Sequence, residues 1–258
     1  MTRLYQAELV CLAAFAGMCL TAYAGFYVAR RSQKQDEPPT EIFSTVSGAV
    51  FALLGLLVAF TFHGAYSRYE HRRQLIRQEV DAIRTVAAYL DLLPAAAQPQ
   101  LRTRLAVYAQ SRTAYYVKLI NPTEAVREKD RANTIQAELW REALAAVRAQ
   151  ADDVTGTLLL PAVNDLARIA SERSVTIRAH IPATIWFFLL GVALVCAGLA
   201  GYRAGVAGRA SKFYLVLFAL VMAAVLYLIL DIEYPRFGLI NLDEANRNLE
   251  ALAETLAR

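Results

Sequence analysis

Four long apolar runs, each free of Asp, Glu, Lys and Arg, are separated by charged segments along the chain. They are Leu9–Ala29, Ile42–Phe62, Ala183–Tyr202 and Phe213–Leu230. The hydrocarbon core of a bilayer is about 30 Å thick and needs about 20 residues of helix, and each run has about that length. Buried helices of soluble proteins are usually shorter and keep a polar stripe. The runs therefore predict four transmembrane helices.

The first run also has features of a cleavable signal peptide. Arg3 precedes it, and the Ala-Tyr-Ala triplet at 22–24 has the small residues of a cleavage site. However, the apolar run continues through Val28, and Arg30 and Arg31 then end it. We therefore expect a retained transmembrane helix.

The second run continues into a long amphipathic helix. No proline occurs from Gly64 to Leu93, and apolar residues recur there at helical spacing. These residues are Ile76, Val80, Ile83, Ala87 and Leu90. Because the first residue that would break the helix is Pro94, we expect one uninterrupted helix from about Thr45 to Leu93.

Three further helices are predicted in the insert between the second and third runs, Ala65–Ile181. Apolar spacing predicts two of them at about Gln98–Ile120 and Thr123–Gln150. The last helix would begin near Pro161, since proline is tolerated in a first turn, and would extend to Pro182. No segment alternates as a strand does, so the sequence predicts an all-α protein.

The basic residues beside the spans predict the topology. Four spans place both termini and the insert on one side, and Lys and Arg close to the membrane are more numerous there, as is typical of the cytoplasmic side. We therefore expect a multi-pass protein of the cell inner membrane with both termini and the insert in the cytoplasm. The expected parts are transmembrane helices 1 and 2 (1–64), a cytosolic helical insert (65–181), transmembrane helices 3 and 4 (182–232) and a cytosolic C-terminal tail (233–258).

Composition and motifs exclude several classes of function. The chain is 57% hydrophobic with a net charge of +4, which fits a membrane protein with basic flanks, and it has no nucleic-acid-binding motif. No histidine pair has metal-binding spacing, and neither a phosphate loop nor a serine-nucleophile motif occurs. The three cysteines all lie in apolar runs, where they would act as packing residues: Cys11, Cys19 and Cys196. We expect no enzyme activity, no metal, no cofactor and no nucleic-acid partner.

A coupled transporter is also disfavoured. Ion-driven transport usually needs ionisable residues at membrane depth, and the four spans have none except His63, at the very end of the second. No span is broken by proline, although broken helices are typical of transporters. Passive conduction fits these spans better.

The ends of the second and fourth runs carry opposite charges. The second ends in FTFHGAYSRYEHRR (60–73) and the fourth in LILDIEYPRFGLINL (228–242). These are either ordinary flanks of membrane spans, or Asp231 or Glu233 pairs with an arginine of the second segment. The candidate arginines are Arg68, Arg72 and Arg73. Because removing one partner of a buried pair costs about 3–5 kcal/mol, such a pair would tie the fourth helix to the second.

Four segments together give a family resemblance. They are LLVAFTFHGAYSRYEHRRQLIRQEVDAIRT (56–85), LDLLP (90–94), LLLPAVND (158–165) and LDIEYPRFGLINL (230–242). With them the chain resembles the bestrophin-like domain family of bacterial membrane proteins, and more distantly the bestrophin anion channels. The resemblance covers roughly Phe43–Leu242.

The resemblance implies a homo-oligomer, with five subunits expected, whose second transmembrane helices line one pore. Aligning Tyr69 and Glu70 with the corresponding aromatic-Glu pair of bestrophins predicts which residues of the second helix line the pore. This pore-lining face would comprise Gly48, Ala52, Leu56, Phe60, His63 and Ser67. The small residues of this face equally suit a close helix-packing surface, and both interpretations stay open.

The resemblance also has a limit. Animal bestrophins hold calcium with a dense acidic cluster after the fourth span, and here only Asp231, Glu233, Asp243 and Glu244 remain, so calcium gating is not expected. We expect an ion channel, with anions as the candidate ions and membrane lipid as the surroundings. The alternative is a non-conducting membrane scaffold or sensor whose helical bundle binds a partner.

Overall fold

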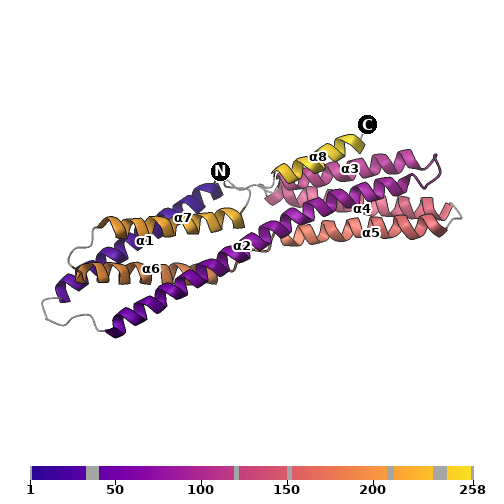
Figure 1. Ribbon diagram of the computed structural model, residues 1–258. Coiled ribbons are helices and arrows are strands. Elements are labelled where there is room, and N and C mark those ends of the chain that lie inside the picture. The colour runs from indigo at the N-terminus through magenta and orange to yellow at the C-terminus, as the bar shows by residue number, and fades with distance from the viewer. Residues whose placement is uncertain are drawn as a thin grey trace. The chain divides into compact units, whose positions relative to one another are not determined.

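The computed structural model of the chain describes residues 2–32, 41–118, 122–149, 153–207, 212–234 and 243–256. Within these ranges the chain forms eight α-helices and no strand, which confirms the predicted all-α class (Figure 1). The helices are α1 (Thr2–Ser32), α2 (Glu41–Leu90), α3 (Gln98–Val117), α4 (Pro122–Ala149), α5 (Asp153–Thr176), α6 (Ala183–Val206), α7 (Lys212–Glu233) and α8 (Asp243–Leu256).

Four of these helices are long and apolar enough to cross a membrane. The segments that qualify are Glu8–Arg31 in α1, Ile42–Leu90 in α2, Ala183–Val206 in α6 and Phe213–Glu233 in α7. Each contains one of the four apolar runs, so the predicted membrane spans are confirmed as helices of suitable length and composition.

Helix α2 is uninterrupted, as predicted, and Figure 1 shows it as one continuous ribbon from Glu41 to Leu90. Its 50 residues correspond to about 75 Å at the usual helical rise. The charged residues from Arg68 onward do not break it, because a change from apolar to polar side chains leaves the backbone hydrogen bonds of a helix unaffected. The helix ends at Leu90, a few residues before Pro94.

The chain divides into two compact units. The first unit comprises Met1–Tyr69 and His180–Asn241, and the second comprises Glu70–Ala179 and Leu242–Arg258. Helix α2 contributes to both: its apolar half belongs to the first unit and its polar half to the second.

A close crossing of α1 and α6 organises the first unit. A Cβ atom at Gly25 of α1 would lie 2.1 Å from the carbonyl oxygen of Gly198, and one at Gly201 of α6 would lie 1.8 Å from that of Ala22. Both distances are well inside van der Waals contact, so the two backbones come this close only because glycine occupies both positions. Small residues at such contacts are the usual means of close helix packing in membranes.

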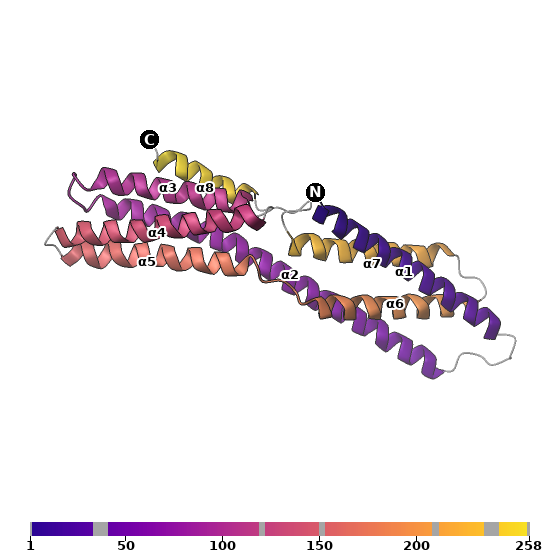
Figure 2. The ribbon, with the colours of Figure 1, turned by 180° about the vertical axis from the view of Figure 1, so that it is seen from behind.

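The second unit has a large apolar core, to which all five of its helical segments contribute. In both ribbon views α8 lies along α3, beside the polar half of α2 and helices α4 and α5 (Figure 2). Core residues include Ile83 and Leu90 of α2, Leu105 of α3, Leu139 of α4, Leu166 of α5 and Leu249 of α8. Ile83 and Leu90 belong to the apolar series that predicted the α2 extension. Helix α8 lies in the part of the chain that the sequence analysis treated as a tail, without assigning a helix.

The predicted start of the last helix of the insert was wrong. Helix α5 begins at Asp153, not near Pro161, and Pro161 lies inside it. Proline in a helix interior removes one backbone hydrogen bond. Here Pro161 is exposed, whereas Leu159, from the turn before it, is fully buried in the core. The packing of that leucine explains why the helix starts earlier than the proline suggested.

The glycine crossing gives the first prediction. Ordinary overpacking of a core costs about 1–3 kcal/mol. We expect Gly201→Leu to lower the stability of the protein in detergent by more than this, because backbone atoms of α1 cannot move aside. Gly191→Leu on the same helix is the control, since nothing lies within 4 Å of a Cβ atom there. Thermal unfolding followed by size-exclusion chromatography measures both variants, and equal melting temperatures would contradict the crossing.

Candidate functional site

The six candidate pore residues all lie on an exposed face of α2. Gly48, Ala52, Leu56, Phe60, His63 and Ser67 are each exposed; we call them the candidate pore face. The two large apolar members are the most conspicuous, because Leu56 is 52% exposed and Phe60 is 66% exposed. No atom lies within 4 Å of a Cβ atom placed on Gly48.

The opposite face of α2 packs inside the first unit. Leu54 is buried in an apolar cluster with residues of α1, α6 and α7, and Ala65 is buried with Ile229 and Ile232 of α7. The buried hydroxyls of this face are satisfied locally, as when Ser47 Oγ donates to the carbonyl oxygen of Phe43 at 2.7 Å. Against the residues that the structure describes, the candidate pore face is therefore not a packing surface within one chain. What lies against it in an assembly stays a prediction.

Glu233, the last residue of α7, binds groups from two other segments. Its carboxylate is fully buried and accepts a hydrogen bond from Arg68 Nε of α2 at 3.1 Å. It also accepts the backbone N–H of Ile181, just before α6, at 3.0 Å. His180 Nδ1 lies 3.5 Å from the same carboxylate, and the His180 ring stacks on Tyr234. One carboxylate thus connects α2, the entry to α6 and the end of α7.

The other residues of the predicted ion pairs have different surroundings. Arg72 is buried in the second unit and donates from Nη2 to the carbonyl oxygen of Ala179 at 2.8 Å. Arg73 Nη1 lies 3.7 Å from Glu70 Oε2, one turn earlier on α2. Asp231 is buried near the end of α7. Of the candidate arginines, Arg68 binds Glu233 directly.

A buried ionic network in the second unit was not found by sequence reasoning. Glu79 of α2 lies between two arginines: Arg112 Nε of α3 donates to one carboxylate oxygen, and Arg173 Nη1 of α5 donates to the other at 2.5 Å. The side chains are only 0–3% exposed. Arg173 Nη2 also donates to Asn246 Oδ1 of α8 at 2.8 Å, so the network joins four helices.

Tyr116 completes this network. Arg112 Nη2 donates to its hydroxyl, and the guanidinium carbon of Arg173 lies 3.2 Å from the centre of its ring. Burial raises the pKa of Tyr116 above its usual value, so the hydroxyl stays protonated. Burial alone would lower the pKa of Arg112, but its neighbours, the Glu79 carboxylate first among them, together raise that pKa above its usual value. Two guanidinium charges therefore face one carboxylate, and one positive charge is left over in the protein interior.

The sequence did contain a signal for this network. Glu79 is three residues after Ile76 and four before Ile83, so it lies on the apolar face of the long helix. A carboxylate at such a position is rarely buried unless it is paired. Its partners lie on other helices, and sequence spacing could not identify them.

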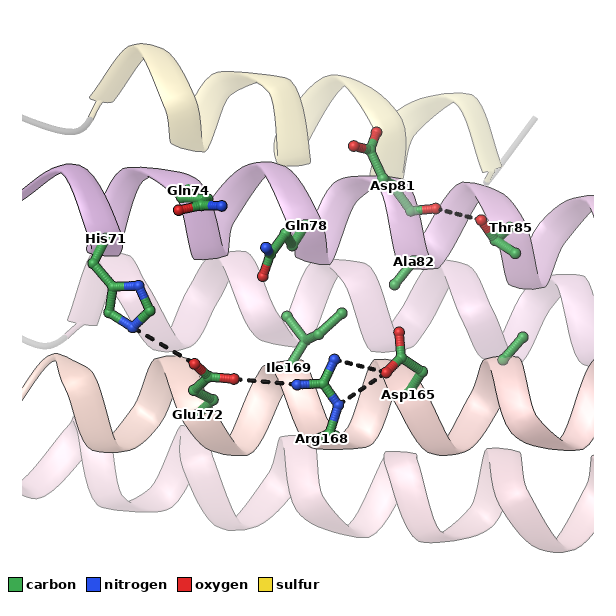
Figure 3. Close-up of a pocket in the computed structure, with 11 residues that line it drawn as sticks. His71, Gln74, Gln78, Asp81, Ala82, Thr85, Asp165, Arg168, Ile169 and Glu172 are labelled. Carbon is green, nitrogen blue, oxygen red and sulfur yellow. Dashed lines mark hydrogen bonds and ion pairs between the residues drawn. The ribbon is translucent and has the colours of Figure 1, made fainter.

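A polar groove lies between α2 and α5 in the second unit, with a volume of about 490 Å³. Figure 3 shows an ionic chain along it: His71 Nε2 lies 3.5 Å from Glu172, which contacts Arg168 at 3.3 Å, and Arg168 in turn binds Asp165 at 2.8 Å. The α2 residues that line the groove include His71, Gln74 and Gln78. They follow Ser67 at spacings of four, three and four residues, and so continue the candidate pore face along the same side of the helix.

Metal binding has no support in the part of the chain that the structure describes. No group of three or more His, Cys, Asp or Glu side chains there is arranged to hold a metal ion. Cys11, Cys19 and Cys196 are free thiols in the described apolar helices.

Apolar helices of membrane-spanning length and a helical second unit define an all-α membrane protein. The family model of the Bestrophin-like domain matches residues 13–245 of this chain. The chain therefore belongs to the Bestrophin-like family, as its motifs predicted. No curated protein matches the chain significantly.

Solved structures show the same fold. A crystal structure of a bacterial bestrophin homologue from Klebsiella pneumoniae is 18% identical, with a TM-score of 0.67 over 94% of this chain and 98% of the homologue. A single-residue variant of such a homologue from the same organism gives 17% identity and a TM-score of 0.71 over 96% and 99% of the two chains. A crystal structure described only as that of a membrane protein is 19% identical, with a TM-score of 0.68 over 96% of this chain and 95% of the other.

The buried network gives the second prediction. We expect Glu79→Gln to destabilise the protein by about 3–5 kcal/mol, because two buried guanidinium groups would lose their only negative partner in the network. Glu138→Gln is the matched control: Glu138 pairs with Arg104 at 2.7 Å on a partly exposed surface, where such pairs contribute about 0–1 kcal/mol. Chemical unfolding followed by circular dichroism compares the two variants. Similar losses in the free energy of unfolding would contradict the role of Glu79 as the carboxylate shared by two buried arginines.

Proposed function

We propose that the protein is a homo-oligomeric ion channel whose pore is lined by the candidate pore face of α2. The observation that carries this proposal is the orientation of that helix. Its apolar half turns one face into its own subunit and leaves the other, with Leu56 and Phe60, exposed. The family and the fold of the solved bestrophin homologues support the same function.

A single chain cannot enclose a pore with this face. The candidate pore face points away from the helices that pack on α2 in the same subunit, so a closed channel needs copies of α2 from several chains around one axis. Cyclic symmetry is the usual way in which identical subunits close such a ring. Five subunits is the number that the family resemblance suggests.

Leu56 and Phe60 are one helical turn apart and would form the narrowest, most apolar part of the pore. Apolar constrictions gate ion flow by excluding water. Toward the start of α2 the same face carries the smaller Ala52 and Gly48, so the pore would widen there. Toward the polar half it carries His63 and Ser67, whose side chains can hold water.

The Arg68–Glu233 pair supports a fixed orientation of α2. It lies near the end of the candidate pore face and connects α2 to α7 and to the entry of α6. A buried carboxylate with defined donors has few alternative arrangements, so α2 cannot turn about its axis without breaking the pair. The constriction would therefore keep its residues directed toward the axis.

Two considerations bear on the identity of the ion, and they favour opposite charges. The family resemblance suggests anions. The polar groove that continues the candidate pore face contains Asp81, Asp165 and Glu172 beside Arg168 and His71, a charge balance that would attract cations. Flux under separate chloride and potassium gradients distinguishes the two.

The third prediction concerns assembly. Purified protein in mild detergent should be an oligomer, because the candidate pore face of one α2 can enclose a pore only together with the same face from other chains. Mass photometry or light scattering with correction for bound detergent counts the subunits. A strictly monomeric protein that still conducts would contradict a shared pore.

The fourth prediction concerns the constriction. Leu56→Ala should widen it and lower the barrier to water entry, and a barrier lower by about 1.4 kcal/mol raises flux about tenfold. Liposomes with purified protein, under a chloride gradient and then a potassium gradient, measure the flux. Leu220→Ala on α7 is the matched control, because Leu220 is similarly exposed, at 55%, but lies on a helix outside the proposed pore.

The outcomes separate the alternatives. Higher flux for Leu56→Ala alone supports the channel. Potassium flux without chloride flux keeps the channel and rejects anions as its ions. No flux from intact oligomers in either gradient favours the non-conducting scaffold or sensor.

A further inference from the structure

A second groove in the second unit lies between α4 and α5 and has a different character. Its volume is about 370 Å³, within the range of sites for small molecules, about 300–1,000 Å³. Lys129, Asn133 and Gln136 line it from α4, and Ser171 and Ser174 line it from α5. Arg178, in the turn that follows α5, completes it.

The groove exists because one side of α5 is built from small residues. Ala167, Ala170 and Ser174 follow one another at helical spacing and form its floor. The side chains opposite them on α4 are long and polar. The floor is closed, because Ala170 and Ser174 are buried, while Ser171 and Asn133 are exposed at the opening.

The charge of this groove is entirely positive. Lys129 and Arg178 are the charged residues that line it, and no Asp or Glu does so among the described residues. The described residues also provide no carboxylate within salt-bridge distance of either cation. By contrast, the groove between α2 and α5 contains carboxylates that bind its arginine.

A buried positive charge lies directly beneath the floor. Arg112 Nη2 donates to the carbonyl oxygen of Ala170 at 3.2 Å, and Ser174 Oγ donates to the same oxygen at 2.8 Å. Arg112 and Arg173 share the single carboxylate of Glu79, so this network has an excess positive charge. Solvent screens buried charges much less than exposed ones. The buried charge beneath the floor and the two cations of the rim, Lys129 and Arg178, therefore both favour the binding of an anion.

We propose that this groove binds a phosphate group, from a lipid headgroup or from a free phosphate ester. The Arg178 guanidinium can bind two phosphate oxygens at once, and the Lys129 ammonium supplies a second charge. The amides of Asn133 and Gln136 and the hydroxyl of Ser171 are neutral donors for the remaining oxygens. This site does not depend on the proposal that the protein conducts ions, since its test measures binding and not ion flux.

The charges of the groove do not distinguish a lipid headgroup from a free phosphate ester. Arg178 precedes the apolar helix α6, which begins at Ala183, and basic residues beside a membrane span commonly bind anionic headgroups. A soluble ester would use the same donors. The experiment therefore has one arm for each source.

The test uses the full chain in detergent and in nanodiscs. Isothermal titration with glycerol 3-phosphate measures the soluble arm. Native mass spectrometry of protein from nanodiscs that contain phosphatidylglycerol and phosphatidylcholine measures the lipid arm. The double variant Lys129→Gln/Arg178→Gln removes the charged rim. The control Arg127→Gln/Arg131→Gln removes the same charge from the opposite face of α4, and Lys129→Arg/Arg178→Lys keeps both charges in the groove.

We expect the rim variant to lose at least about tenfold in affinity for the ligand that binds, which corresponds to about 1.4 kcal/mol. The control should stay within about twofold, and the charge-conserving variant should keep most of the binding. Binding in the soluble arm assigns a free ester, and retention of phosphatidylglycerol over phosphatidylcholine assigns a headgroup. No binding in either arm, or equal losses in the rim variant and the control, would overturn the proposal. Unchanged melting temperatures and elution volumes show that a loss of binding is not a loss of folding.

Discussion

The carboxylate of Glu233 sets the orientation of the helix on which the proposed function depends. It is fully buried, and a buried charge is tolerated only with partners close at hand. The arginine of α2 and the backbone N–H before α6 are such partners. Because both lie on segments far from Glu233 in sequence, satisfying one charge fixes three segments. The inward face of α2 follows from this arrangement, and so does the exposure of Leu56 and Phe60 on the other side.

The two units are stabilised by different means. In the first, Gly25 and Gly201 let two backbones touch, which suits surroundings where apolar side chains gain little by leaving the lipid. In the second, large side chains such as Leu105 and Leu139 fill a core, which is the usual source of stability in water. The polar half of α2 belongs to this core through Ile83 and Leu90.

Sequence reasoning was most successful where a pattern is local and repeats. The four apolar helices and the continuity of α2 past its charged residues follow from hydropathy, helical spacing and the absence of proline, and each is confirmed. The start of α5 was wrong because Leu159 packs against residues that are distant in sequence. The glycines of α1 and α6 were visible, but their contact depends on which two helices cross. Glu79 could be recognised as an unusual residue, whereas Arg112 and Arg173 could be identified only in three dimensions. For the candidate pore face, the sequence with its family resemblance selected six residues that prove to share one exposed side of α2.

The network of Glu79, Arg112 and Arg173 also restricts how the sequence can change during evolution. Losing the carboxylate leaves two buried cations, and losing one arginine removes a partner from the carboxylate and from either Tyr116 or Asn246. A replacement at any one position is therefore unfavourable until the others have changed, although an apolar set of similar volume would be tolerated. Related chains should keep all three residues or have lost all three. These positions, on three different helices, are then inherited as a group.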